Sequence, residues 1–368
     1  MKINNTIVDE FKFENDIKYF SKIDTRDPRM GDYLTNRTIR DISRYDVYVA
    51  LILKLRLDYF TAYVCDKRVG EINDEFFAPM YDSDYLFAIL LKNERLHYLY
   101  PKKSRFGYYL NEIPFYFENT KARLVHLNDY RGFKDPINTD LRQIMLPGSV
   151  IKENTRRNNI LVKINLDTLS TVFNARIFLN GQYSTLTRGV YQYNHKDETI
   201  NNLYNTKIWE LNDDVEVISQ ETKVTSKEFP FPTIVNTKYQ FNNLLKVKND
   251  TFSLNLKNWF NHVIYNDFDT TDRQLDFYPD FYGKDSYVYY LQFDKNIQLI
   301  NSLEKKNIIN EFGELAISVE QIKPNTVKIS TIFITTNSII TADKINAVKE
   351  IYDEIQRLNN SHLLFTLE

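Results

Sequence analysis

The most regular pattern of apolar and polar positions lies at the C-terminal end of the chain, over 311–368. Two alternating runs, ELAISVEQI and TVKISTIFITT, flank a KPN turn at 323–325, which predicts two strands joined as a hairpin. The stretch TADKINAVKEIYDEIQRLNN then predicts a helix, with Thr341 as its N-cap and Asp343 in its first turn. Its apolar positions form one stripe at helical spacing: Ile345, Val348, Tyr352, Ile355 and Leu358. With HLLFTLE as a final strand, the pattern predicts a strand–strand–helix domain, which we place over 236–368.

The middle of the chain, 120–235, has the period-two pattern of strands. ILVKINLDTL alternates, and ARIFLNGQYSTL has strand-forming residues on both sides of Asn180 and Gly181, which is a strong hairpin signal. EFPFPTI at 228–234 carries two prolines, which cannot donate to a sheet ladder, so we expect a linker there. We therefore predict a β-rich domain over 120–235.

The N-terminal part of the chain is mixed. Residues 1–40 are polar, with several turn residues and no sustained period, which predicts an extended arm. IRDISRYDVYVALILKLRLD at 39–58 has apolar residues on one helical face, and YFTAYVC after it is rich in strand formers. The predicted fold class is α+β and multi-domain, with an arm over 1–40, a helical part with a small module over 41–119, and the two domains described above.

Length and charge narrow the class of protein. At 368 residues the chain is long enough for two or three domains. Its formal net charge of −2 predicts no attraction of the whole molecule to nucleic acid or to an anionic membrane. The longest apolar run, VYVALILKL, is too short to span a bilayer, and the N-terminus lacks the apolar core of a signal peptide, so we expect neither membrane insertion nor export.

The residue types that usually carry catalysis are scattered along the chain. There is one cysteine, Cys65, in a strand-like run, and none of the five histidines lies three or four residues from another, so no helical metal pair is expected. With only 9 glycines, the chain contains no glycine-rich phosphate loop, and it also lacks the common hydrolase and metalloprotease motifs. We therefore assign no catalytic, cofactor-binding or metal-binding residue and predict no cofactor.

Two local clusters leave alternatives open. Asp267, Asp269, Asp272 and Asp276 could supply oxygen ligands for calcium, but the glycine and the closing glutamate of an EF-hand are missing, and a solvated turn is the simpler interpretation. YPKKSRFGYY at 100–109 interleaves basic and aromatic residues, as sites for single-stranded nucleic acid do, and a solvated loop is again simpler.

Aromatic residues are unusually frequent, with 26 Tyr and 25 Phe, and the segment over 75–117 is dense in them. There a strand ending at Cys65 is followed by a predicted helix, EINDEFFAPMY, a polar break at 82–84, a second predicted helix, YLFAILLKN, and a strand in GYYLNEIP. This order resembles a LysM-type module, and MYDSDYLFAILLKN resembles the LysM-like segment of the baseplate wedge family of contractile-tailed phages. The segment departs from that pattern because it lacks a Gly-Asp before the first helix and carries Pro79 inside it.

The resemblance implies a structural virion protein, a baseplate or tail-assembly component that docks between other subunits and is not an enzyme. Its partners would be other virion proteins, in several copies of a symmetric assembly, with no nucleic acid and no membrane. It would be made in the host bacterial cytoplasm and end in the virion. The candidate interface anchors are aromatic, and some of them must also fill the module's own core: Phe76, Phe77, Tyr81, Tyr85 and Phe87. Two alternatives stay open: a cell-wall or carbohydrate-binding protein, and a hydrolase whose site is built from distant carboxylates.

Overall fold

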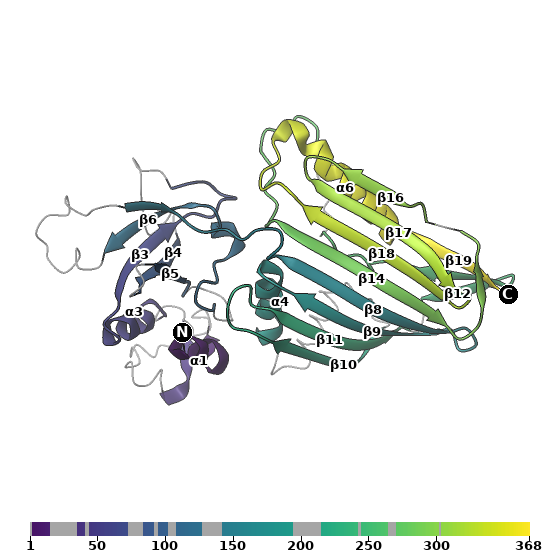
Figure 1. Cartoon of the computed structure of the whole chain (residues 1–368), viewed down its shortest axis with the longest axis horizontal. Coiled ribbons are helices and arrows are strands. Elements are labelled where there is room, and N and C mark those ends of the chain that lie inside the picture. Colours follow the sequence, from purple (N-terminus) through teal and green to yellow (C-terminus); the bar gives the residue numbers. More distant parts are fainter. Residues whose placement is uncertain are drawn as a thin grey trace, which may run out of the picture. The chain divides into compact units, whose positions relative to one another are not determined.

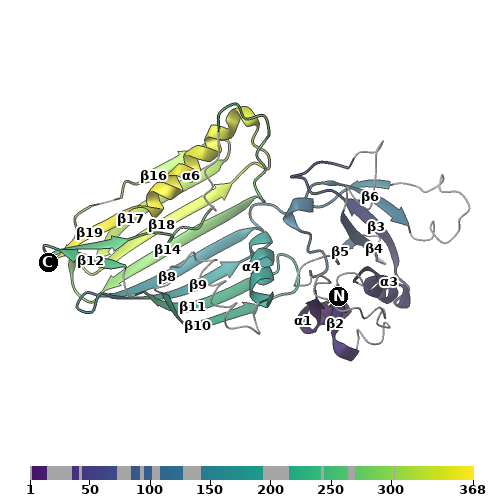
Figure 2. The ribbon, with the colours of Figure 1, turned by 180° about the vertical axis from the view of Figure 1, so that it is seen from behind.

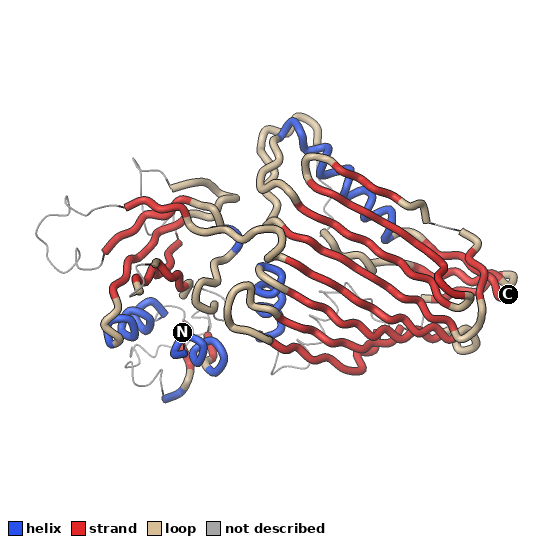
Figure 3. Tube along the Cα trace, viewed as in Figure 1, coloured by secondary structure: helices blue, strands red, loops and turns tan. Residues whose placement is uncertain are grey.

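A computed structural model of the chain describes residues 2–14, 35–40, 44–72, 84–91, 95–101, 108–126, 142–193, 215–241, 244–263, 270–301 and 303–368. The fold is mixed α+β and rich in strands, which confirms the predicted class (Figure 3). The chain divides into two compact units. The first contains Met1–Ser149, Thr185–Tyr193 and Ser226–Phe229, and the second contains Val150–Ser184, Asn194–Thr225 and Pro230–Glu368.

The second unit is built on an eight-stranded sheet. Neighbouring strands are antiparallel except β8 and β14, which are parallel. In spatial order the strands are β10 (Val215–Val224), β11 (Thr233–Phe241), β9 (Ser170–Leu179), β8 (Thr155–Asn165), β14 (Gly283–Phe293), β18 (Thr326–Thr335), β17 (Gly313–Lys323) and β16 (Lys306–Ile309).

One face of this sheet is covered by a second layer. That layer holds helix α6 and a four-stranded sheet, which consists of β12 (Leu245–Lys248), β13 (Thr251–Asn255), β19 (His362–Leu367) and β15 (Ile297–Leu299). Along β8, Ile160, Val162 and Ile164 are buried while the residues between them are exposed or half-buried, because successive side chains of a strand point to opposite faces. No described helix or sheet lies over the opposite face, which is in front in Figure 1, and Figure 2 shows α6 lying across the covered face. We call the uncovered side the outer face.

Helix α6 (Ile345–Asn359) confirms the helix predicted from the apolar stripe. Ile345, Val348, Ile355 and Leu358 are buried in the core of the second unit, and Tyr352 packs against it. The hairpin of β17 and β18 and the final strand β19 are confirmed as well. The N-cap differs, because a short 3-10 helix (Ala342–Lys344) precedes α6 and Thr341 makes no side-chain cap bond.

The hairpin predicted at Asn180 and Gly181 is wrong. The observed hairpin lies earlier in the chain and joins β8 to β9. After β9, at Asn180 and Gly181, the chain turns into helix α4 (Gln182–Tyr193). Gly181 has φ +57°, and an added Cβ there would lie 2.1 Å from Asn154 Oδ1, so no side chain fits. Asn154 Oδ1 accepts a hydrogen bond from the backbone N–H of Gln182 at 2.9 Å, which starts the helix and overrides the strand propensity of the following residues.

The linker predicted at 228–234 is wrong for Thr233 and Ile234, which belong to β11, whereas residues 228–232 lie in the connection between β10 and β11. These two strands pair directly, so the segment joins neighbours in one sheet. Strand β11 runs through residue 235, where we placed a domain boundary. Strands from both predicted domains, 120–235 and 236–368, form the eight-stranded sheet and share its core.

Among its described residues, the first unit contains a five-stranded antiparallel sheet, helices α1 (Lys2–Glu10) and α3 (Arg44–Lys54), and most of α4. The sheet order is β5 (Leu96–Leu99), β4 (Asp84–Leu90), β3 (Asp58–Val64), β6 (Lys121–His126) and β7 (Arg142–Met145). It also contains a 3-10 turn (Phe115–Phe117) and the short parallel pair β1 (Lys12–Glu14) and β2 (Thr38–Arg40). The helix predicted over 39–58 is therefore confirmed for 44–54, whereas α1 lies within the predicted N-terminal arm.

The second helix of the predicted LysM-like module is wrong, because 84–90 forms the strand β4. Leu86 and Ala88 are buried in one core cluster of the unit, and Phe87 and Ile89 in another. A strand buried on both faces has a continuous apolar run, and such a run cannot be distinguished from a buried helix by periodicity alone. Most of the first predicted helix, 71–81, lies outside the described residues.

Among the described helices, none has the length and the apolar character needed to cross a bilayer.

We expect Ile351→Ala on α6 to lower the free energy of unfolding of the second unit by about 2–5 kcal/mol, because it opens a cavity where Ile351 is completely buried. Asn346→Ala on the exposed side of the same helix is the control and should change stability by less than about 0.5 kcal/mol. Urea unfolding followed by tryptophan fluorescence measures both. Equal effects of the two substitutions would contradict the packing of α6 described here.

Candidate functional site

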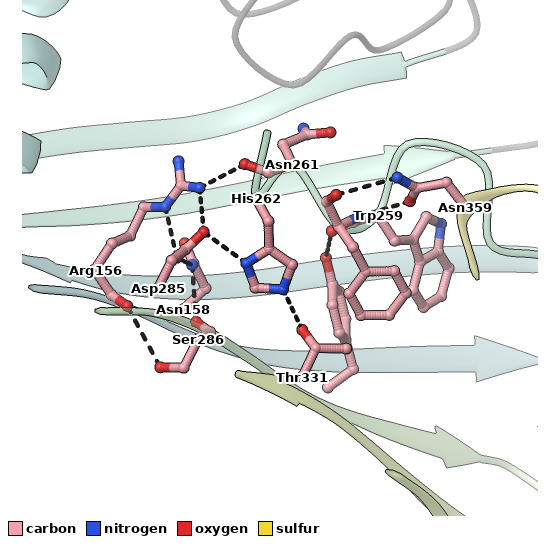
Figure 4. A network of polar contacts seen from close by, with 11 residues as sticks. Arg156, Asn158, Trp259, Asn261, His262, Asp285, Ser286, Thr331 and Asn359 are labelled. Carbon is pink, nitrogen blue, oxygen red and sulfur yellow. Dashed lines mark hydrogen bonds and ion pairs between the residues drawn. The ribbon is translucent and has the colours of Figure 1, made fainter. Parts of the chain in front are cut away.

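A chain of polar side chains crosses the apolar core of the second unit (Figure 4). Asp285 lies on β14 on the covered face of the sheet, directly beside Arg156 on the parallel strand β8. His262 comes from the segment after β13, and Thr331 from β18. We call the four residues Arg156, Asp285, His262 and Thr331 the core network.

The contacts of the core network are close and directional. Arg156 Nε donates to Asp285 Oδ1 at 2.7 Å, and its terminal nitrogen donates to Asp285 Oδ2 and to the carbonyl of Asn261. His262 Nδ1 lies 2.8 Å from Asp285 Oδ2, and His262 Nε2 lies 2.7 Å from Thr331 Oγ1. Because an ionised carboxylate only accepts hydrogen bonds, His262 Nδ1 carries a proton and donates to Asp285.

The electrostatics of the site favour an ionised Asp285. Burial alone would raise the pKa of this carboxyl, but the guanidinium of Arg156 and the contact with His262 outweigh burial and hold the pKa below its usual value. Burial likewise disfavours the charged form of Arg156, but Asp285 more than compensates and raises the pKa of Arg156 well above its usual value. The pair is therefore charged in the folded protein.

The order hydroxyl–imidazole–carboxylate is the one used for nucleophilic catalysis, in which the histidine takes a proton from the hydroxyl. Here, however, the side chains of His262 and Asp285 have 0% exposure, and Thr331 is also completely buried. The rings of Tyr287 and Phe333 pack edge-on against His262 at 4.9 and 5.9 Å. A substrate would have to displace this core to reach Thr331, so the geometry fits a structural role.

The core network holds the segment over 256–263 to the sheet, and two further side chains, Tyr289 and Asn359, add contacts to the sheet and to α6. Tyr289 on β14 donates its hydroxyl hydrogen to the carbonyl of Trp259. The side chain of Asn359, at the end of α6, accepts from Phe260 N at 2.9 Å and donates to Phe260 O at 3.1 Å (Figure 4). Since this segment lies between sheet and helix, the polar contacts fix its register against both.

The predicted interface anchors lie in different surroundings. Three are outside the described residues: Phe76, Phe77 and Tyr81. Phe87 is completely buried, with its ring 5.2 Å from that of Tyr45 and 5.8 Å from that of Tyr59, so it fills the core of the first unit. Tyr85 is half-buried and packs edge-on against Tyr45 at 5.2 Å.

The aspartate cluster is only partly described. Asp267 and Asp269 lie outside the described residues. Asp276 Oδ1 accepts a hydrogen bond from the backbone N–H of Ala342 at 3.0 Å, which helps to start the turn before α6. Within the described ranges, no group of three or more His, Cys, Asp or Glu residues is arranged to hold a metal ion.

Sequence motifs do not reveal the core network. Its members lie far apart in the chain, with Arg156 and Asp285 separated by 129 positions, so no local spacing connects them. The alternation of KDSYVYYLQF places Asp285 on the same side as Tyr287, Tyr289 and Leu291, and that pattern could have indicated a buried carboxylate.

Comparison with known proteins gives few matches. Residues 250–365 match a domain of unknown function with a solved structure, DUF3858. No curated protein matches the chain. A solved structure from Parabacteroides distasonis ATCC 8503, named "putative protease", aligns with a TM-score of 0.48 and 10% sequence identity over 99% of this chain and 51% of that one. This chain thus spans about half the length of that protein, and a likeness of this degree carries no functional assignment.

We expect Asp285→Asn to lower the free energy of unfolding by about 3–5 kcal/mol at neutral pH, because it leaves Arg156 without its counter-charge. The folded pKa of Asp285 lies below the unfolded value of about 3.9. The stabilisation that Asp285 gives the folded protein is therefore complete above the unfolded pKa and is lost as the pH falls through the folded pKa. The stability difference between wild type and D285N should shrink in urea titrations below about pH 4.

The control for this titration is Glu320→Gln, an exposed carboxylate on β17, which should change stability by less than about 0.5 kcal/mol. A wild-type advantage over D285N that stays constant down to about pH 2 would contradict an ionised Asp285.

Proposed function

We propose that this chain is a non-catalytic assembly protein, and that the outer face of the eight-stranded sheet docks on an acidic surface of a partner protein. The observation that carries the proposal is the distribution of charge on that face. Its central strands contribute only basic charged side chains: Arg157 and Lys163 on β8, Arg176 on β9, Lys238 on β11, Lys284 on β14 and Lys328 on β18.

These cations are available to a partner. All are exposed except Lys328, which is half-buried. Among the described residues, none of them forms an ion pair within 4.0 Å. At a strand spacing of about 4.8 Å, the five central strands span about 19 Å, which is wide enough for a protein docking patch. A basic area of this size inside a chain of net charge −2 favours a partner of opposite charge.

Two features favour an acidic protein surface over nucleic acid. Acidic residues occur on the outer face of the flanking strands, with Glu216 and Glu221 beside a single cation, Lys223, on β10, and with Glu314 and Glu320 on β17. They limit the basic area on both sides and would repel a polyanion that extended across the sheet. In addition, the ring of Phe178 already packs against the guanidinium groups of Arg157 and Arg176 at 5.3 and 5.0 Å, so it is not a free platform for stacking a base.

The proposal assigns no catalysis to the core network, because its hydroxyl, imidazole and carboxylate are sealed from solvent. The specific setting expected from the LysM-like resemblance, the baseplate or tail of a phage, stays a prediction. It would supply the kind of partner proposed here, a neighbouring subunit of a larger assembly.

The test is a charge reversal on the outer face. Full-length wild type and the double variant Arg176→Glu, Lys238→Glu are co-expressed with the products of neighbouring genes and studied by size-exclusion chromatography with light scattering. We expect wild type to form a complex that weakens from about 0.05 M to about 0.5 M salt, and the variant to bind at least about tenfold more weakly.

The matched control is Lys246→Glu, Lys248→Glu on β12, which makes the same change of charge on exposed residues of the other layer and should bind like wild type. Equal binding by all three proteins would contradict docking on the outer face. Binding of a fluorescent DNA oligonucleotide that only the double variant R176E/K238E loses would assign the face to nucleic acid instead.

A further inference from the structure

The eight-stranded sheet ends on one side at β10, which lies along its lower edge in Figure 1. This strand of ten residues pairs with β11 on one side, and among the described strands it has no neighbour on the other. An edge strand carries backbone groups that can pair with another chain, so proteins often interrupt such edges with a bulge or a proline. The edge of β10 is therefore a candidate surface for strand pairing.

A bulge limits the regular part of this edge to the second half of β10. The register with β11 shifts between Val217 and Ser219, so Ile218 has no partner on β11. From Ser219 onward, every residue through Val224 has a partner. No proline interrupts β10. The segment over 219–224 is thus a short, regular edge of known register.

The backbone groups that point away from the sheet belong to alternate residues of this segment. Directly after the strand, Thr225 donates its backbone N–H to the carbonyl of Pro232 at 2.8 Å, in register with the pairs of β10 and β11. Backbone groups of an antiparallel strand point alternately to one neighbour and to the other. Those of Gln220, Thr222 and Val224 therefore point away from β11, and among the described residues they have no hydrogen-bond partner.

The charges beside the middle residue, Thr222, are complementary to those of a second copy. Glu221 and Lys223 flank Thr222, and both are exposed on the outer face of the sheet. No ion pair within 4.0 Å in the described part of the chain includes either of them. If β10 of a second copy ran antiparallel beside the first, with a two-fold axis at Thr222, Glu221 of each copy would lie opposite Lys223 of the other.

This register is the one that the charges favour. The two charged positions form a pair without backbone hydrogen bonds between them, in which the side chains approach most closely. Moving the axis to the preceding residue would place Glu221 opposite its own copy, and moving it to the following residue would do the same for Lys223. Like charges directly opposite each other are destabilising, so both neighbouring registers are disfavoured.

We propose that two copies of this chain pair antiparallel through β10, with the two-fold axis at Thr222, and so extend the eight-stranded sheet across both copies. Backbone hydrogen bonds supply the affinity, and the two Glu221–Lys223 pairs select the register. The formal net charge of −2 on each chain gives little repulsion between copies. The pairing does not rest on the docking of the outer face, and its test uses this chain alone, so either proposal can fail without the other.

The test is charge reversal at the two flanking positions, measured by sedimentation velocity of the full-length chain over a concentration series. We expect wild type to dimerise, and Glu221→Lys and Lys223→Glu each to weaken the dimer by at least about tenfold, because each places like charges opposite each other twice. An equimolar mixture of the two variants should dimerise like wild type, since one variant is acidic at both positions and the other is basic at both.

Two further variants separate backbone pairing from charge. Thr222→Pro removes an N–H that points away from β11, so the fold should be kept and the dimer lost. Glu216→Lys changes a charge on the same strand before the bulge, outside the paired segment, and should dimerise like wild type. Circular dichroism checks the fold of each variant.

Three results would overturn the proposal. A dimer that persists in a folded Thr222→Pro variant would place the interface elsewhere. Failure of the mixed charge variants to associate would contradict the antiparallel register. A wild type that stays monomeric at every concentration would exclude pairing between copies, and loss of binding to an acidic partner in Thr222→Pro would then assign the edge to a strand of that partner.

Discussion

The second unit depends on the difference between the two faces of its eight-stranded sheet. The strands alternate, and the apolar residues of the central strands point to one side, where α6 and the four-stranded sheet cover them. Burial of this face supplies the main favourable free energy of the unit, because apolar area removed from water contributes roughly 25 cal/mol per Å². The stability of the unit does not require the outer face to be covered, so the side chains on that face can be suited to binding a partner.

Charge follows the same division. On the covered face, Arg156 and Asp285 neutralise each other, and their polar contacts join segments that are distant in the chain. A pair of this kind, with Asp285 completely buried and Arg156 partly exposed, adds little to stability compared with apolar packing, but it penalises any register that separates the partners. On the outer face the basic residues have no acidic neighbours on the central strands. Their mutual repulsion lowers stability, and their charges remain available for a partner.

The sequence predicts local elements where one period dominates. The stripe of α6 and the alternation of β17 and β18 are long enough to exclude other structures, and they are confirmed. The prediction is wrong at β4, where both sides are buried and the period disappears, and at Gly181, where a distant Asn154 starts a helix. The core network could not be predicted from motifs, because Arg156, His262 and Asp285 meet only through the order of strands in the sheet.

The sequence also does not show which aromatic residues lie on the surface and which lie in the core. Their number suggests surface anchors, but Phe87 lies in a cluster of rings inside the first unit, and Phe173, Tyr239 and Trp259 pack together in the second. Charge alternation along strands is the better guide to the surface of this fold, because a cation that alternates with buried residues must point outward.

The most direct test of the proposed docking is a lysine footprint, obtained by acylation and mass spectrometry for the chain alone and in a complex with the acidic partner we propose. We predict that Lys163, Lys238 and Lys284 on the outer face become unreactive in the complex, whereas Lys246 and Lys248 on the other layer keep their reactivity. Unchanged labelling of the outer face in a complex that is fully formed would contradict docking there.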